Sequence, residues 1–166
     1  MRLVMTLSVL LFVALAGTSV NAKLAETEHD RVVAYTAFLE SNPFDAQAPA
    51  MRAWLLDWED KSKDVVDVVC PDLFKPLPSK DIPYSSELVA QFIFGSAANQ
   101  IANPEQKGKL VPNQLAGFRS MLKSYASILR SKPDAHIPRL DELSKQEANG
   151  TLEQYLTPLI GTYCKN

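Results

Sequence analysis

The two histidines are the residues of this chain best suited to acid–base or metal chemistry near neutral pH. Glu26, His29 and Asp30 are spaced so that one helix face could carry all three, and a divalent metal could use such a set. Acidic side chains in the first turn of a helix also complement the helix dipole. We therefore favour a charged, solvated helix start here and predict no metal site.

His136 lies in a loop bounded by Pro133 and Pro138, where it could act as a general base. No nucleophile motif accompanies it, because Gly95-Ser96 does not complete G-x-S-x-G. The sequence also lacks G-x-G-x-x-G, G-x-x-x-x-G-K-[ST] and H-E-x-x-H, the usual marks of nucleotide cofactors and zinc proteases. We predict no cofactor and favour a protein that is not an enzyme.

A ligand groove is one interpretation of the aromatic residues. Asp57 stands between Trp54 and Trp58, and an acid flanked by two aromatics could face a ligand held against Phe92 and Phe94 of another helix. The two tryptophans are four residues apart on an apolar helix face, so core packing is the favoured interpretation. The neighbouring carboxylates alternate with Lys61 and Lys63, a mixture typical of a solvated surface: Asp57, Glu59, Asp60, Asp64 and Asp67.

The N-terminus predicts a secretory signal peptide over residues 1–22, cleaved after Ala22. Arg2 supplies a positive start, residues 3–16 are almost wholly apolar, and Val20-Asn21-Ala22 places small residues three before and one before the cut. A membrane anchor needs about 20 apolar residues, and Gly17 ends this run early. We expect a secreted or periplasmic protein with no membrane span after cleavage.

The two cysteines take their meaning from that compartment. Cys70 and Cys164 would enter an oxidising environment, where a single pair has one possible connectivity, so we predict a disulfide between them. No C-x-x-C motif indicates redox catalysis, and two cysteines fall short of a structural zinc site. Asn149-Gly150-Thr151 matches the N-glycosylation sequon in a loop we expect to be exposed.

Composition fits one globular domain, predicted over residues 23–166. The chain has 166 residues, 46% of them hydrophobic, and a formal net charge of -2. That charge argues against the basic footprint of a nucleic-acid binder.

Eleven prolines divide the chain into segments of helical length. We predict an all-α, single-domain bundle of about five or six helices, in which apolar residues recur at helical spacing. The expected helices cover residues 25–41, a segment capped by Asp45 that ends at Lys61, and residues 85–102, 112–131, 138–149 and 151–164.

Details of three segments can be predicted further. The segment 85–102 is apolar nearly all round, so we expect a central helix with a patch of small residues, Gly95 to Ala98, at a close helix contact. Residues 64–70 should be extended or a short helix, and the proline-rich connector 71–83 should wrap the outside of the bundle. Thr151 and Gln154 should form a capping box; the inward positions of that last helix should be Leu152, Tyr155, Leu156, Leu159 and Tyr163.

Several positions in the C-terminal half bear on a family. The stretch Phe92-Ile93-Phe94-Gly95-Ser96-Ala97-Ala98, the break at Lys132-Pro133 and the late Cys164 are similar to the small secreted helical immunity proteins that neutralise type VI secretion amidases. This resemblance implies a helical periplasmic binding protein and carries over no site residues.

Three functional hypotheses follow. The first is a non-enzymatic, secreted or periplasmic helical protein that binds another protein or acts as an accessory factor. The alternative is a helical carrier of a small apolar ligand, and the third is a hydrolase that uses His136 with a carboxylate. An enclosed apolar cavity would favour the carrier, whereas a solid core with an exposed apolar surface would favour the protein binder.

Overall fold

A computed structural model describes residues 27–164, so the predicted signal peptide of residues 1–22 lies outside the described residues. The described part is all-α, as predicted, with seven α-helices, one short 3-10 turn and no strand. The count exceeds the expected six by one short helix, α3, inside the proline-rich connector. The elements are α1 (Glu28–Ser41), α2 (Ala48–Lys61), α3 (Pro71–Phe74), α4 (Ser85–Ala102), η1 (Pro104–Gln106), α5 (Leu110–Ser131), α6 (Pro138–Ala148) and α7 (Leu152–Tyr163).

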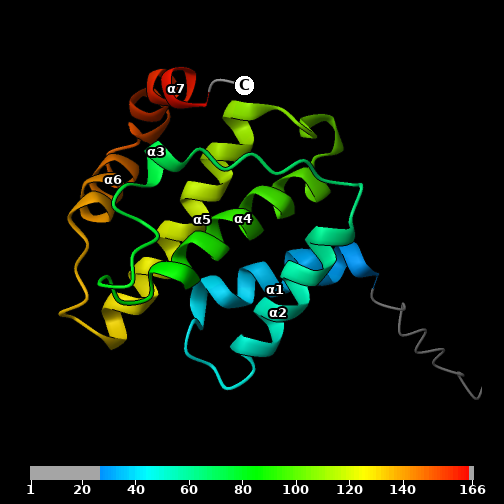
Figure 1. The fold of residues 1–166 in the computed structure, drawn as a ribbon, viewed down its shortest axis with the longest axis horizontal. Coiled ribbons are helices and arrows are strands. Elements are labelled where there is room, and N and C mark those ends of the chain that lie inside the picture. Colours follow the sequence, from blue (N-terminus) through cyan, green and yellow to red (C-terminus); the bar gives the residue numbers. More distant parts are fainter. Residues whose placement is uncertain (1–26, 165–166) are drawn as a thin grey trace, which may run out of the picture.

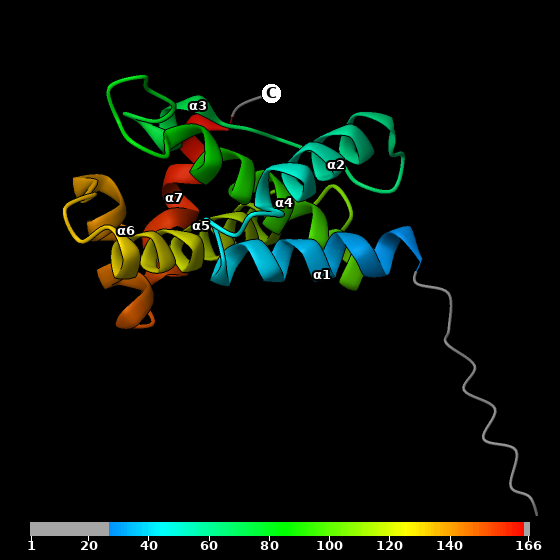
Figure 2. The ribbon, with the colours of Figure 1, turned by 90° about the horizontal axis from the view of Figure 1, so that it is seen from below.

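The central pair of the fold is α4 and α5. Figures 1 and 2 place α1 and α2 on one side of this pair and α3, α6 and α7 on the other. Because α4 is apolar on most faces, it serves two hydrophobic clusters at once: Leu88 and Phe92 join the larger one, and Phe94 and Ala97 the smaller. This confirms the expected central position of residues 85–102.

The two clusters lie on different faces of α4. The larger draws buried side chains from α3 to α7, while the smaller combines α1 and α2 with Val65 of the extended chain after α2. A buried polar side chain also crosses between helices, because Gln91 Nε2 donates to Thr36 O at 3.1 Å and to Ser120 Oγ at 2.9 Å. Gln91 thereby links α4 to both α1 and α5.

Two glycines allow α4 and α5 to approach closely. A Cβ atom at Gly95 would lie 2.3 Å from Ser120 Cβ, and one at Gly117 would lie 2.6 Å from the Phe92 ring. The small-residue patch predicted at Gly95 is therefore a helix contact, and Gly117 makes the reciprocal contact from α5.

The connector after α2 differs from its predicted course. Residues 65–70 are extended, as one of the two expected alternatives, but residues 71–83 do not merely wrap the outside. Leu73, Phe74 and Leu77 are buried in the larger cluster, where Phe74 stacks on Phe118 and meets Phe92 edge-on. Proline fixes the backbone without preventing its neighbours from burying apolar side chains.

The predicted disulfide is present. Cys70, at the start of α3, is bonded to Cys164, at the end of α7, with their Cα atoms 5.2 Å apart. The bond joins the middle of the chain to its end across a sequence separation of 94 residues.

Three local predictions need correction. Asp45 accepts a hydrogen bond from Gln47 N at 2.8 Å, so it shapes the turn before α2 and does not cap the helix. No capping box forms at α7, because the Thr151 hydroxyl donates to Gln146 Oε1 and O instead. Tyr163 is exposed, and Ile160 takes the inward position one turn before the disulfide.

Candidate functional site

The residues of the predicted ligand groove lie in different places. Phe92 belongs to the larger cluster and Phe94 to the smaller, and both are at most 1% exposed. Trp58 is buried in the smaller cluster, Trp54 packs edge-on against Tyr35, and Asp57 is exposed. Trp54, Trp58 and Phe94 thus share the smaller cluster, whereas Phe92 and Asp57 lie apart from it, so the five side chains do not line one groove.

Asp57 and the two histidines make local polar contacts. Asp57 pairs with Lys61 one turn along α2, with Nζ 2.6 Å from Oδ1. His29 Nε2 lies 2.9 Å from Asp64 Oδ2, and Asp30 forms a capping box with Thr27 at the start of α1. Residues 27–164 contain no group of three or more potential metal ligands; Glu26 lies outside them.

His136 forms a hydrogen-bonded chain with Asp141 and Tyr125. Its Nδ1 lies 3.1 Å from Asp141 Oδ1, which also accepts from the Tyr125 hydroxyl at 2.7 Å. The Tyr125 oxygen in turn accepts from Ile137 N at 2.8 Å. Burial raises the pKa of Tyr125 to about 12, so its phenol remains a donor near neutral pH. Burial opposes ionisation of Asp141, but the hydrogen bonds from Tyr125 and His136 lower its pKa overall. These hydrogen bonds therefore stabilise the loop between α5 and α6.

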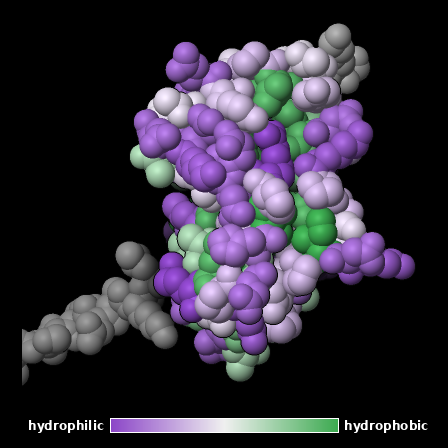
Figure 3. Space-filling model, turned by 90° about the vertical axis from the view of Figure 1, so that its left-hand side faces the viewer, coloured by the Kyte–Doolittle hydropathy of each residue, from purple (hydrophilic) through white to green (hydrophobic). Residues whose placement is uncertain are grey.

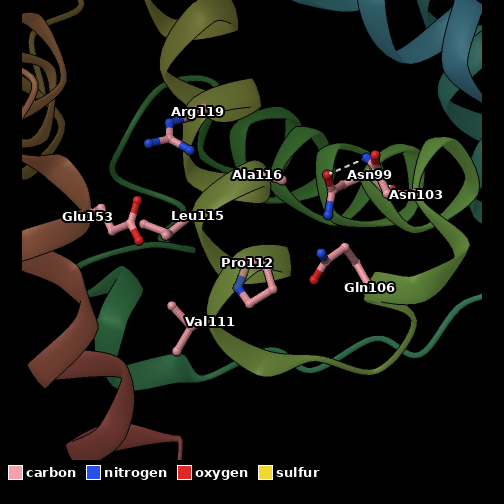
Figure 4. A pocket seen from close by; sticks show the side chains of 9 residues that line it. All are labelled: Asn99, Asn103, Gln106, Val111, Pro112, Leu115, Ala116, Arg119 and Glu153. Atoms are coloured by element: carbon pink, nitrogen blue, oxygen red, sulfur yellow. Dashed lines mark hydrogen bonds between the residues drawn. The ribbon is translucent and has the colours of Figure 1, made fainter.

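A surface hollow of about 350 Å³ lies where α4, η1, α5 and α7 meet (Figure 4). Its floor is apolar, and its sides are polar. The floor consists of Val111, Pro112, Leu115 and Ala116; one side carries Asn99, Asn103 and Gln106, and the other Arg119 and Glu153. No sequence motif marks this set, because its residues come from four elements that are separate in the sequence.

The amide side of the hollow is held by its own hydrogen bonds. Asn103 Nδ2 donates to Asn99 Oδ1 at 3.1 Å, Asn99 Nδ2 donates to Asn113 Oδ1 at 2.8 Å, and Asn113 Nδ2 donates to Gln106 O at 2.8 Å. This chain orients Asn99 and Asn103 along the last turn of α4 before any ligand arrives. Orientation in advance lowers the entropy cost of binding.

A second hollow, of about 260 Å³, adjoins the first through Arg119. It is mainly apolar, with Leu122, Ala126 and Ala148 in its lining. We call the two hollows together the α5 groove, because Pro112, Ala116, Arg119, Lys123 and Ala126 line it at helical spacing.

The charged rim of the α5 groove reaches neighbouring helices. Arg119 Nε lies 3.4 Å from Glu147 of α6, and Lys123 Nζ lies 3.0 Å from Glu40 of α1. On the side of the molecule shown in Figure 3, apolar side chains are visible chiefly in recesses between polar ones.

The most strongly perturbed carboxyl lies elsewhere, on α2. Burial, followed by repulsion from Asp67, raises the pKa of Glu59 to about 8, and burial also raises that of Asp67. Glu59 Oε1 is buried and has no hydrogen-bond partner among the described residues. The interpretation of this stretch as a solvated surface is therefore wrong for Glu59, although Asp57, Asp60, Asp64 and, taken as a whole residue, Asp67 are exposed.

Glu59→Gln is expected to stabilise the protein at pH 8. In the wild type, the folded state keeps the Glu59 proton between pH 4.5 and about 8 while the unfolded state loses it, so stability falls as pH rises through this window. The variant has no such proton. With allowance for solvent screening, we expect roughly 1–2 kcal/mol greater unfolding free energy at pH 8 and little difference near pH 4.

Urea denaturation of both proteins from pH 4 to 9 measures this effect. Glu105→Gln, at an exposed position of η1, is the matched control and should follow the wild type. Parallel pH profiles for the wild type and Glu59→Gln would contradict the raised pKa.

Among residues 27–164, no helix has the length and apolar character needed to cross a membrane. Comparison of the chain with protein-family models, with curated proteins and with solved structures finds no significant match.

Proposed function

We propose that this chain is a secreted or periplasmic, non-enzymatic helical protein that binds another protein through the α5 groove. The predicted signal peptide of residues 1–22 supports export. The Cys70–Cys164 disulfide supports it independently, because such bonds persist mainly in oxidising compartments.

The observation that carries the proposal is the composition of the α5 groove. An apolar floor offers area that a partner can remove from water, while the Asn99 and Asn103 amides and the Arg119 and Glu153 charges fix the partner's orientation. Arg119 lies in the middle, between both hollows, where it could provide a large share of the binding energy.

A carrier of a small apolar ligand is supported less well. The aromatic side chains proposed to hold such a ligand, Phe92 and Phe94, are packed inside different clusters. The two hollows of the α5 groove are open to solvent, and the larger one has polar sides. A hydrolase is supported less still, because His136 contacts Asp141, which in turn accepts from Tyr125, and no nucleophile lies in this hydrogen-bonded chain.

Ala126→Trp tests the groove. Ala126 is exposed at the apolar end, so an indole there should occupy the space of a partner side chain while leaving the core intact. Ala53→Trp, at an exposed position of α2, is the matched control. With tagged proteins exported in the native host, we expect Ala126→Trp to retain a tenth or less of the wild-type partner, and Ala53→Trp to retain all of it.

Cross-linking followed by quantitative mass spectrometry gives the readout. Equal recovery with Ala126→Trp would contradict the α5 groove as the binding surface. Native and denaturing intact-mass analysis of the same material reports cleavage after Ala22 and any bound compound. A small apolar molecule released on denaturation would favour the carrier instead.

A further inference from the structure

Side-chain amides take the place of a neighbouring strand along one edge of the segment defined here as residues 63–69, between α2 and α3, which is extended from Val65 onward (Figure 1). The Gln100 side chain of α4 accepts from Val66 N at 3.0 Å through Oε1 and donates to Val66 O at 3.2 Å through Nε2. Gln114 Nε2 of α5 donates to Val68 O. A backbone fixed in this way has the pairing pattern of a β-strand without a sheet.

The opposite edge of the segment is unpaired. Hydrogen-bonding groups of successive residues in an extended chain point to alternate sides, so those of Val65, Asp67 and Val69 face away from the two glutamines. Within residues 27–164, none of these three N–H or C=O groups has a hydrogen-bond partner. Such a row is a template for pairing with another extended chain.

The side chains of the segment suit this pairing. Val66 is 45% exposed and Val69 is 43% exposed, although both are β-branched and apolar. Branched side chains pack well against those of an added strand. Val65, in contrast, is buried in the smaller cluster and anchors the segment to α2 and α4.

The charge of the segment indicates what kind of partner segment would bind there. Asp67 lies close enough to Glu59 to disfavour its ionisation, and neither carboxyl has an ion-pair partner among the described residues. A lysine or arginine opposite Asp67 would relieve that repulsion.

We propose that residues 63–69 bind an extended, lysine- or arginine-containing segment of another protein by β-strand addition along the free edge of Val65, Asp67 and Val69. Backbone hydrogen bonds would supply affinity, and the valines and Asp67 would supply selectivity. The surface is distinct from the α5 groove, whose lining includes none of these three residues.

Amide hydrogen exchange monitored by NMR gives the first test, on the oxidised protein with its disulfide intact. In the free protein, the Val66 N–H should exchange at least tenfold more slowly than the Asp67 and Val69 N–H groups, because only Val66 is hydrogen-bonded. Slow exchange of the Asp67 N–H in the free protein, before any probe is added, would overturn the proposal.

A synthetic probe gives the second test: an acetylated, amidated hexapeptide of alternating lysine and valine. We expect it to bind and to slow exchange at Val65, Asp67 and Val69. N-methylation removes the backbone N–H donors of the peptide. A peptide methylated at the alternate residues whose N–H groups face the protein should bind at least tenfold more weakly, whereas one methylated at the other residues should bind almost as well as the unmodified peptide. Equal binding of both methylated peptides would overturn strand addition.

Protein variants separate backbone pairing from charge and from the α5 groove. Asp67→Pro removes one outward N–H and should abolish probe binding, whereas Asp67→Asn keeps the N–H and should weaken binding severalfold. If Asp67→Pro fails to fold, the methylated peptides still decide the question.

Ala126→Trp should bind the probe as tightly as the wild type does, so a failure of the α5 groove proposal can be distinguished from a failure of this one. Concentration-dependent dimerisation that protects the same amides in place of probe binding would assign the edge to a second copy and overturn the proposal.

Discussion

Gly117→Ala is expected to destabilise the protein by about 1–2 kcal/mol, although alanine is the better helix former. The new Cβ would lie 2.6 Å from two atoms of the Phe92 ring and 2.8 Å from the Phe92 carbonyl oxygen. The ring has little room to move, because Phe74 meets it edge-on with centroids 4.5 Å apart and Phe118 packs at 5.1 Å. Overpacking of this kind costs about 1–3 kcal/mol or more, against a gain of about 1 kcal/mol in helix propensity.

Gly95→Ala should have an effect of the same sign, because its Cβ would lie 2.3 Å from Ser120 Cβ and 3.0 Å from a backbone oxygen of α5. It should also disturb the hydrogen bond between Ser120 and Gln91. Neither clash can be relieved by rotation of a flexible side chain alone, so α4 and α5 must separate.

Gly161→Ala is the matched control for both variants. Gly161 lies inside α7, nothing lies within 4 Å of a Cβ built there, and the residue is exposed. Alanine should therefore stabilise the protein by up to about 1 kcal/mol through helix propensity alone. Equilibrium unfolding in urea measures all three variants. A gain in stability at Gly117 similar to that at Gly161 would contradict the close α4–α5 contact.

These glycines also show what sequence can and cannot indicate. The all-α class and the long helices followed from apolar spacing, and the unusual composition of residues 85–102 marked a central helix. The patch at Gly95 indicated a close contact, but not that α5 was its partner. Gly117 has no such signature, because a lone glycine in a polar–apolar pattern indicates no contact until the facing helix is known.

The candidate sites were less predictable for a related reason. The α5 groove is formed by Asn99, Gln106, Arg119 and Glu153, which belong to four different elements. Gln100 and Gln114 support the backbone of residues 63–69, and no sequence motif marks either residue. Chemistry that depends on backbone groups leaves no trace in residue types.

The connector shows why local rules fail where the chain is irregular. Proline density predicts the lack of long regular structure between Pro71 and Pro83, but not the burial of Leu73, Phe74 and Leu77. Those side chains are drawn inward by the larger cluster, and Cys70 beside them is only 2% exposed. The disulfide thus ties this buried segment to the end of α7.

Loss of the Cys70–Cys164 disulfide is expected to have the largest effect on stability. The bond closes a loop with a sequence separation of 94 residues, for which the chain-entropy model gives about 4–5 kcal/mol as an upper value. The double variant Cys70→Ala/Cys164→Ala should lose nearly this amount of unfolding free energy. Loss of the sulfur atoms themselves should add little to it, because alanine leaves only a small cavity at Cys70 and Cys164 is only partly buried.

Unfolding of the oxidised protein, the reduced protein and the double variant separates the contributions. Reduction alone frees the loop while keeping both sulfur atoms, so the reduced protein should lie within about 1 kcal/mol of the double variant if loop entropy dominates. The unreduced protein should have a mass two hydrogens lower than the reduced one.

Hydrogen exchange should show where the protein loosens first. Because α7 packs on α3 next to the bond, amide exchange in residues 152–163 should become faster on reduction before that in α4 and α5 does. Uniform loss of protection in all helices would instead mean that the disulfide stabilises the whole domain as one cooperative unit.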